Sequence, residues 1–211
     1  MNFKHQNGFT LIEVLISLVM SSVVVISLYN ISKVHQDTYV AQDQVVAMQQ
    51  NLRAAMLLPI KEIRMAGYDP SGSANATIIN ATGDTLHFTL DLDGNGDTSG
   101  TNEDVTYSLY TADGIQKLGR KQPTLNMPVA EYINNIEFYY TMADNTKTLT
   151  PANPKDIRAV QVTVLAHSIS TDPKITTTSS YTTPSGATWT LPAGYKGRMK
   201  TMSVQCRNMG L

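Results

Sequence analysis

The pattern of hydrophobic positions divides the chain into a helical first third and a β-rich remainder. From Val14 to Ser32 no side chain is charged, and a run of this length is about what a tilted helix needs to span a bilayer. After Lys33 the sequence stays free of glycine and proline until Pro59. An apolar stripe with steps of three and four residues, typical of a helix that packs on one side, is formed there by Val45, Met48, Leu52, Ala55, Met56, Ile60 and Ile63. We therefore expect one helix over residues 9–66, kinked at Pro59 and ended by Gly67.

Beyond Gly67 the sequence changes to short β-type runs separated by turns. The clearest runs cover residues 77–79, 85–90, 105–110, 157–166 and 198–206, and Asp113-Gly114 is a turn signal before Ile115. Residues 132–142 mix isoleucine, phenylalanine and tyrosine, which predicts a short helix running into a strand. The fold class expected is α+β, with the long N-terminal helix packed on an antiparallel β-sheet.

Residues 168–197 are rich in threonine, serine, proline and glycine and predict a long loop between the last two strands. This loop carries Trp189, Tyr181 and Tyr195. We expect these aromatic side chains to pin the loop to the domain, and the alternative is a surface for a partner or ligand.

Composition narrows the functional classes. The chain has 211 residues and a net charge of −1, which is enough for one membrane helix and one domain, and it shows no basic patch that would indicate a nucleic-acid partner. Cys206 is the only cysteine, so no intrachain disulfide can form, and we expect a small buried side chain there.

The N-terminal segment Gly8-Phe9-Thr10-Leu11-Ile12-Glu13 needs a chemical explanation. A charge at the bilayer centre costs about 2.5–3.5 kcal/mol, so Glu13 needs a partner, which we expect on another chain. Gly8 lets a protease approach the backbone closely. A secretory signal peptide does not fit, because no Ala-x-Ala-like site follows and Glu13 interrupts the apolar run. A plain signal anchor leaves Gly8-Phe9 and Glu13 unexplained.

This segment resembles the signature of type IV prepilins and of type II secretion pseudopilins. The resemblance implies that a prepilin peptidase cuts after Gly8, that Phe9 becomes the N-methylated mature N-terminus, and that Glu13 pairs with the terminal amine of a neighbouring subunit. The body resembles PilW-type minor pilins in four segments, which are residues 51–69 (including Arg64-Met65-Ala66-Gly67-Tyr68-Asp69), 129–140, 157–162 and 198–208. The J-type pseudopilins share this layout.

The resemblance also implies an organisation and a location. Residues 1–8 are a leader peptide, 9–32 a transmembrane and filament-core helix, 33–66 the periplasmic part of that helix, and 67–211 a β-rich pilin-like domain. The protein is expected in the bacterial inner membrane as a single-pass protein, with its C-terminal domain in the periplasm, and then in the pilus at the cell surface.

One acidic segment has ligand chemistry. Asp91, Asp93, Asn95 and Asp97 alternate oxygen donors around Gly94 and Gly96, as in the first half of an EF-hand-like Ca²⁺ loop. The twelfth position is Asn102, so Glu103 arrives one residue late. A Ca²⁺ site and a solvated Asp/Gly turn both remain open.

The function predicted is that of a minor pilin, a structural subunit of a type IV pilus tip or priming complex. Its expected partners are the prepilin peptidase, other minor pilins, the major pilin and, before assembly, inner-membrane lipid. The alternatives are a J-type pseudopilin, a tip adhesin or ligand-binding subunit, and a membrane-tethered enzyme. We do not expect an enzyme, because no catalytic motif occurs and His5, His35, His87 and His167 lack a zinc-ligand spacing.

Overall fold

The computed structural model describes residues 8–123 and 125–210, so residues 1–7 of the predicted leader lie outside the described part. A single helix, α1 (Leu11–Ile63), opens the fold. Gly67 follows the helix with a φ of 77°, as is usual for a glycine that ends a helix. The chain divides into two compact units, Met1–Asp43 and Gln44–Leu211, which are described separately below.

The first unit contains residues 11–43 of α1, whose apolar side chains are exposed from Leu11 to Val40. It belongs to the one helix of the described chain that is long and apolar enough to cross a membrane. The hydroxyls of Ser17, Ser21, Ser22 and Ser27 bond back to the helix's own carbonyl oxygens, as Ser17 does to Glu13 and Ser21 does to Ser17, each at 2.7 Å. Such bonds satisfy polar groups without water, as a bilayer requires.

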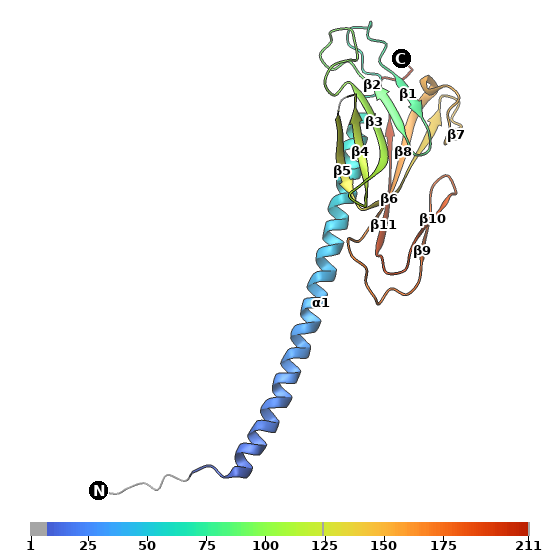
Figure 1. The fold of residues 1–211 in the computed structure, drawn as a ribbon. Helices are drawn as coiled ribbons and strands as arrows, with labels where there is room; N and C mark the ends of the chain where they lie inside the picture. The colour runs from blue at the N-terminus through green and yellow to red at the C-terminus, as the bar shows by residue number, and fades with distance from the viewer. Residues whose placement is uncertain (1–7, 124, 211) are drawn as a thin grey trace. The chain divides into compact units, whose positions relative to one another are not determined.

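The second unit contains antiparallel sheets (Figure 1). A five-stranded sheet has the order β1-β2-β3-β4-β5, with β1 (Ile78–Ala81), β2 (Leu86–Thr89), β3 (Asp104–Ala112), β4 (Ile115–Gln122) and β5 (Leu125–Glu131). A four-stranded sheet has the order β11-β8-β6-β7, with β6 (Ile133–Met142), β7 (Lys147–Thr148), β8 (Ile157–His167) and β11 (Gly197–Gln205). A 3-10 helix, η1 (Pro154–Asp156), precedes β8, and β9 (Ser179–Thr182) pairs with β10 (Thr188–Leu191) in a hairpin.

The core of this unit lies between residues 44–63 of α1 and the sheets. Its helix side is the predicted apolar stripe, from Met48 to Ile63. The largest fully buried side chains on the strands are Phe88, Tyr107, Phe138 and Tyr140. Burial of such a side chain stabilises the fold by about 1.5–3 kcal/mol. The α+β class, with a long N-terminal helix and antiparallel sheets, is confirmed.

Two sequence predictions were wrong in detail. Residues 132–142 contain no helix, because residues 133–142 form the strand β6. Ile136, Phe138 and Tyr140 lie on one face of this strand in the core, and Glu137 is buried on the other face. Tyr132 has a φ of 58° and separates β5 from β6. Residues 168–197 are not only loop, since they contain the β9–β10 hairpin.

This hairpin is anchored to the four-stranded sheet. Glu137 of β6 is buried, and its Oε2 accepts hydrogen bonds from the hydroxyls of Thr183 (2.8 Å) and Ser185 (2.6 Å) in the hairpin turn. A Cβ added at Gly197 of β11 would come within 2.6 Å of the Tyr181 hydroxyl, so glycine lets Tyr181 approach the sheet. Tyr181 and the buried Leu191 thus hold the hairpin to the domain, as expected for an aromatic side chain of this segment.

Candidate functional site

The N-terminal site is built around the first turn of α1. The Thr10 backbone N–H and hydroxyl both donate to Oε2 of Glu13, each at 2.8 Å, and the Glu13 N–H donates to the Thr10 hydroxyl at 3.3 Å. This is a capping box, in which the first and fourth residues satisfy each other's backbone donors. The second oxygen of Glu13, Oε1, makes no hydrogen bond within the described residues.

The two residues before the cap are open. A Cβ added at Gly8 would meet no described atom within 4 Å, so packing does not require glycine there. The Phe9 side chain is 89% exposed. The structure therefore places Gly8, Phe9 and Glu13 in one accessible segment, with the Glu13 carboxylate held at the helix N-terminus, where the helix dipole favours a negative charge.

The acidic loop gathers only part of the predicted ligand set. One carboxylate oxygen from each of Asp91, Asp93 and Glu103 lies within 4.8 Å of the others. Asp91 and Glu103 are buried, whereas Asp93 is exposed. Asp97 is not part of this group, and Glu103 is part of it although it comes one residue after the EF-hand position.

Backbone N–H groups surround the two buried carboxylates. Glu103 accepts from Leu92 (2.7 Å), Asp93 (3.3 Å) and Gly100 (2.8 Å). Asp91 accepts from the N–H groups of Gly94 and Gly96 and from the Ser71 hydroxyl. These bonds fix the loop and offset the cost of burying the two anions.

Asn95 and Asp97 take part in local turns instead. The Asn95 side-chain oxygen accepts from the Asp97 N–H, and the Asp97 carboxylate accepts from the Ser99 N–H and hydroxyl. The two bonds from Ser99 lower the pKa of Asp97 below its ordinary value. The two side chains are thus committed to neighbours along the chain.

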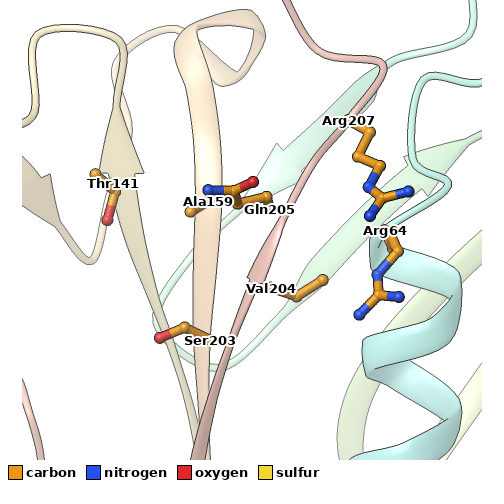
Figure 2. A pocket seen from close by; sticks show the side chains of 7 residues that line it. All are labelled: Arg64, Thr141, Ala159, Ser203, Val204, Gln205 and Arg207. Atoms are coloured by element: carbon orange, nitrogen blue, oxygen red, sulfur yellow. The ribbon is translucent and has the colours of Figure 1, made fainter.

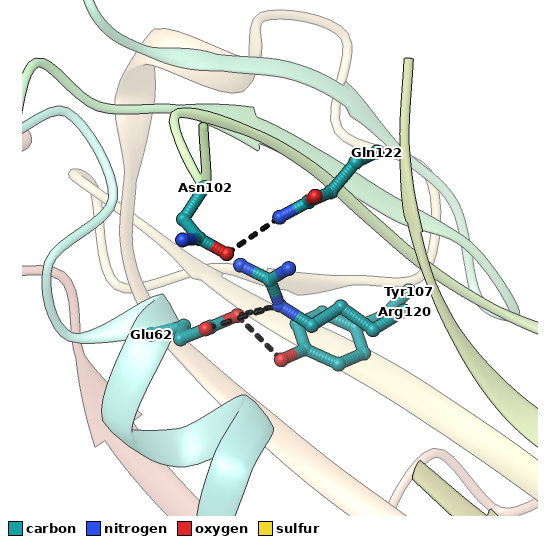
Figure 3. A network of polar contacts seen from close by, with 5 residues as sticks. All are labelled: Glu62, Asn102, Tyr107, Arg120 and Gln122. Carbon is teal, nitrogen blue, oxygen red and sulfur yellow. Dashed lines mark hydrogen bonds and ion pairs between the residues drawn. The ribbon is translucent and has the colours of Figure 1, made fainter. Parts of the chain in front are cut away.

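A buried charge network joins α1 to the five-stranded sheet (Figure 3). Nε of Arg120 donates to both oxygens of Glu62, at 3.1 and 2.9 Å, and the Tyr107 hydroxyl donates to the same carboxylate. Burial and the neighbouring Glu62 charge raise the pKa of Tyr107 above its ordinary value. Burial alone would lower the pKa of Arg120, but the hydrogen bond and charge of Glu62 outweigh it and raise that pKa. All three side chains are used in structural contacts.

Sequence reasoning missed two features of these sites. Thr10 was overlooked as a functional residue, although Thr10-Leu11-Ile12-Glu13 before an apolar run is itself a capping-box signal. The Glu62–Arg120 pair was also missed, because 58 residues separate its members and no local pattern marks them.

Comparisons with known proteins bear on the N-terminal site. Residues 3–29 match the family model described as the prokaryotic N-terminal methylation motif. Among solved structures, a type IV-like pilin from Thermus thermophilus aligns at 14% identity over 77% of this chain and 98% of its own, with a TM-score of 0.46. A likeness of that size decides neither fold nor function. No curated protein matches.

The methylation motif covers Gly8, Phe9 and Glu13, so the residues of the accessible segment coincide with the matched region. Such a motif implies processing by a prepilin peptidase and other pilins as partners. It is consistent with membrane anchoring by the apolar helix. The match is to this N-terminal motif, and it does not resolve the PilW-type subgroup.

Proposed function

We propose that the protein is a minor pilin, a structural subunit that enters a type IV pilus tip or priming complex and promotes pilus assembly. The observation that carries the proposal is the N-terminal methylation motif at residues 3–29, together with a Glu13 carboxylate that keeps Oε1 unbonded within the described residues. The capping box presents that carboxylate at the start of an apolar helix. There it meets the charged Phe9 amine of a neighbouring subunit, and each group neutralises a charge that is costly in hydrocarbon.

In this proposal the peptidase cuts after Gly8, and methylation follows on the Phe9 amine. The subunit waits in the inner membrane with its C-terminal domain in the periplasm, and α1 then exchanges lipid for neighbouring helices. Ser17 and Ser21 already satisfy their hydroxyls within the helix, so this exchange exposes no new polar group there.

The test compares three variants for processing and for recovery in sheared pili. Gly8→Ala should retain the leader. Glu13→Gln should be cleaved normally but be lost from pili, because the amide cannot neutralise an ammonium. The matched control Ser21→Ala changes another polar residue of the same helix and should enter pili normally. Incorporation of Glu13→Gln at the control level would remove the proposed role of Glu13.

Two alternatives have distinct outcomes in the same strains. A J-type pseudopilin predicts that deletion of the gene blocks protein secretion and leaves piliation intact. A tip adhesin predicts that removing residues 168–197 spares piliation and abolishes attachment. Because the hairpin in that segment is anchored on Glu137 through Thr183 and Ser185, its removal also uncovers the sheet, so a milder variant that changes only the exposed Thr190 is the better adhesin test.

We propose as a second function that the acidic loop binds Ca²⁺ through Asp91, Asp93 and Glu103. The supporting observation is that three carboxylates lie within 4.8 Å of one another and two of them are buried. Carboxylates and backbone carbonyls are the ligands Ca²⁺ takes in proteins, at six to eight oxygens in all. Asn95 and Asp97 lie in the same loop and require a rearrangement of their turns to join.

Thermal unfolding of the full chain in detergent tests this site. Millimolar Ca²⁺ should raise the midpoint, because a ligand that binds only the folded state stabilises it. Asp93→Asn should abolish the shift with little effect on metal-free stability, because Asp93 is exposed. An equal shift in wild type and Asp93→Asn, or no shift in wild type, would leave the loop as an Asp/Gly turn.

A further inference from the structure

The outer strand of the four-stranded sheet has an open edge. β11 lies at one end of the order β11-β8-β6-β7 and pairs with β8 alone. The N–H of Cys206 bonds the carbonyl of Arg158 at one end of this pairing, and the N–H of Ser168 bonds the carbonyl of Lys196 at the other. In an antiparallel ladder the residues that exchange hydrogen bonds alternate with residues whose backbone groups point away.

The hydrogen bonds at both ends of β11 indicate the same alternation between residues that bond β8 and residues whose backbone groups point away. The even-numbered residues of β11 bond β8, so the backbone N–H and C=O groups of Met199, Thr201, Ser203 and Gln205 point out of the sheet. Within the described residues none of these outward groups makes a hydrogen bond. The edge is nine residues long, which is longer than a typical strand.

The edge is basic and lacks internal partners. Arg198 and Lys200 on β11, Arg207 just after it and Arg64 at the end of α1 are all exposed. None of them has a carboxylate within 4.0 Å in the part of the chain that the structure describes. The chain as a whole has a net charge of −1, so these four basic side chains form a local cluster of positive charge.

A hollow lies beside the C-terminal half of this edge. A pocket of about 490 Å³ is lined by Arg64, Thr141, Ala159, Ser203, Val204, Gln205 and Arg207 (Figure 2). Ser203 and Gln205 point to one face of the sheet, whereas Val204 points to the other, so the pocket wraps around the strand edge. The guanidinium groups of Arg64 and Arg207 lie on the same side of it in Figure 2.

We propose that the β11 edge docks an extended acidic segment of another protein, which adds to the sheet as a further strand. The outward backbone groups supply the hydrogen bonds of such strand addition. Carboxylates at every second position of the added strand fall on one face, the face of Arg198 and Lys200. The apolar side chains between them fall on the opposite face, beside Met199 and Thr201, and a last carboxylate reaches Arg64 and Arg207.

The occupant is another protein and not a second copy of this chain. The other described edge strands offer no matching acid pattern: β1, β9 and β10 carry no charge, and β7 carries Lys147. β5 has Glu131 alone, which already pairs with Lys117 at 2.7 Å. Charge complementarity therefore favours a different, acidic partner.

Charged residues on an edge strand also protect it from unwanted pairing, and this explanation makes a different prediction. A protective edge works with either sign of charge and binds no strand. A docking edge binds acidic strands, depends on the sign of its own charge, and needs its outward N–H groups.

The experiment measures fluorescence anisotropy of labelled synthetic peptides with the full chain in detergent. The probe alternates valine and glutamate. One control peptide has the same composition with the glutamates consecutive, and a second replaces glutamate by lysine. Only the alternating acidic peptide should bind wild type.

Two protein variants separate the contributions of charge and backbone. Ser203→Pro removes one outward N–H, which an edge strand tolerates, and should weaken binding roughly threefold to tenfold, the equivalent of one hydrogen bond. Ser203→Ala keeps that N–H and should bind like wild type. Arg198→Glu combined with Lys200→Glu keeps a charged edge and should switch preference to the lysine peptide.

Unchanged melting temperatures confirm that each variant is folded. Equal binding of the alternating and consecutive peptides would show attraction of charge without strand addition and would overturn the proposal. The same conclusion follows if Ser203→Pro binds as well as Ser203→Ala, or if no peptide binds wild type.

Discussion

The sequence distance between hydrogen-bonded polar groups is short in residues 8–43 and long at key positions of the unit Gln44–Leu211. In the first segment each bonded hydroxyl has a partner within four residues, as in the pairs Thr10–Glu13 and Ser17–Glu13. In the second, key polar groups pair across long stretches of chain, as Glu62 does with Arg120 and Glu137 with Thr183. In the first segment the bonded hydroxyls find their partners within the same helix, whereas one oxygen of Glu13 makes no hydrogen bond within the described residues. In the proposed function that oxygen meets a partner on another subunit, whereas the second unit is held by its own contacts.

The largest effect should come from breaking the long-range charge pair. Arg120→Met leaves Glu62 without its cation in a mostly buried site and should lower the free energy of unfolding by about 3–5 kcal/mol. Lys117→Met removes the cation from a pair whose carboxylate side is 41% exposed and should cost less than about 1 kcal/mol. Urea unfolding followed by circular dichroism compares the two, and equal losses would contradict the distinction.

Alkaline pH should destabilise the second unit selectively. Burial raises the pKa of the Cys206 thiol from 9.0 to about 12, and burial also raises the pKa values of the Tyr107 and Tyr140 phenols. The folded state therefore holds these protons more tightly than the unfolded state. Their contribution to stability is complete below pH 9 and declines as the pH rises toward the folded pKa values, by up to about 1.4 kcal/mol per pH unit for each group.

Urea midpoints measured across this range check the sign. Cys206→Ala should delay the onset of the decline from the ordinary thiol range, near pH 9, to the tyrosine range, near pH 10. Tyr140→Phe should leave the onset near pH 9 and reduce the slope above it. A stability that rises with pH through this range would contradict the burial of these groups.

A smaller loss is expected at the hairpin anchor. Thr183→Val removes one of two hydroxyl donors to the buried Glu137 carboxylate and should cost about 1.5–3 kcal/mol, the usual range for a hydrogen bond to a charged group. Amide exchange should accelerate in β9 and β10 before it does in β8. The exposed neighbour Thr182→Val is the matched control, and identical exchange in both variants would remove the anchor.

The smallest effect belongs to the local cap. Thr10→Ala should cost about 1 kcal/mol of helix stability at the N-terminus of α1, visible as faster amide exchange over residues 11–14. Thr10→Ser keeps the hydroxyl and should restore protection. Because the cap also holds one oxygen of Glu13, Thr10→Ala should reduce entry into pili less than Glu13→Gln does.

The contrast between local and long-range contacts also explains which helices and strands could be predicted from the sequence. The helix was predicted because its apolar stripe and Gly67 are local signals, and the strands around Phe88, Val162 and Val204 alternate clearly. β4 was missed because its sequence, Ile115–Gln122, mixes charged residues with few apolar ones. The β9–β10 hairpin was missed because its stability depends on Glu137, which lies 46 residues before Thr183.

The candidate sites show the same distinction between contiguous residues and residues that the fold brings together. Gly8, Phe9 and Glu13 form a contiguous motif and were visible in the sequence, whereas the meeting of Asp91 and Asp93 with Glu103 depends on a loop closure that spacing alone left open. The open edge of β11 follows from sheet order. No pattern within the strand indicates which side lacks a neighbour.

The central claim is that this chain is a pilin-type subunit processed at its N-terminus. Its most direct test is mass spectrometry of the protein purified from the membrane of its own host, with fragmentation of the N-terminal peptide. The account predicts a chain that begins at Phe9 and carries one methyl group on the terminal amine. A chain that retains residues 1–8, or that begins at a position other than Phe9, would contradict it.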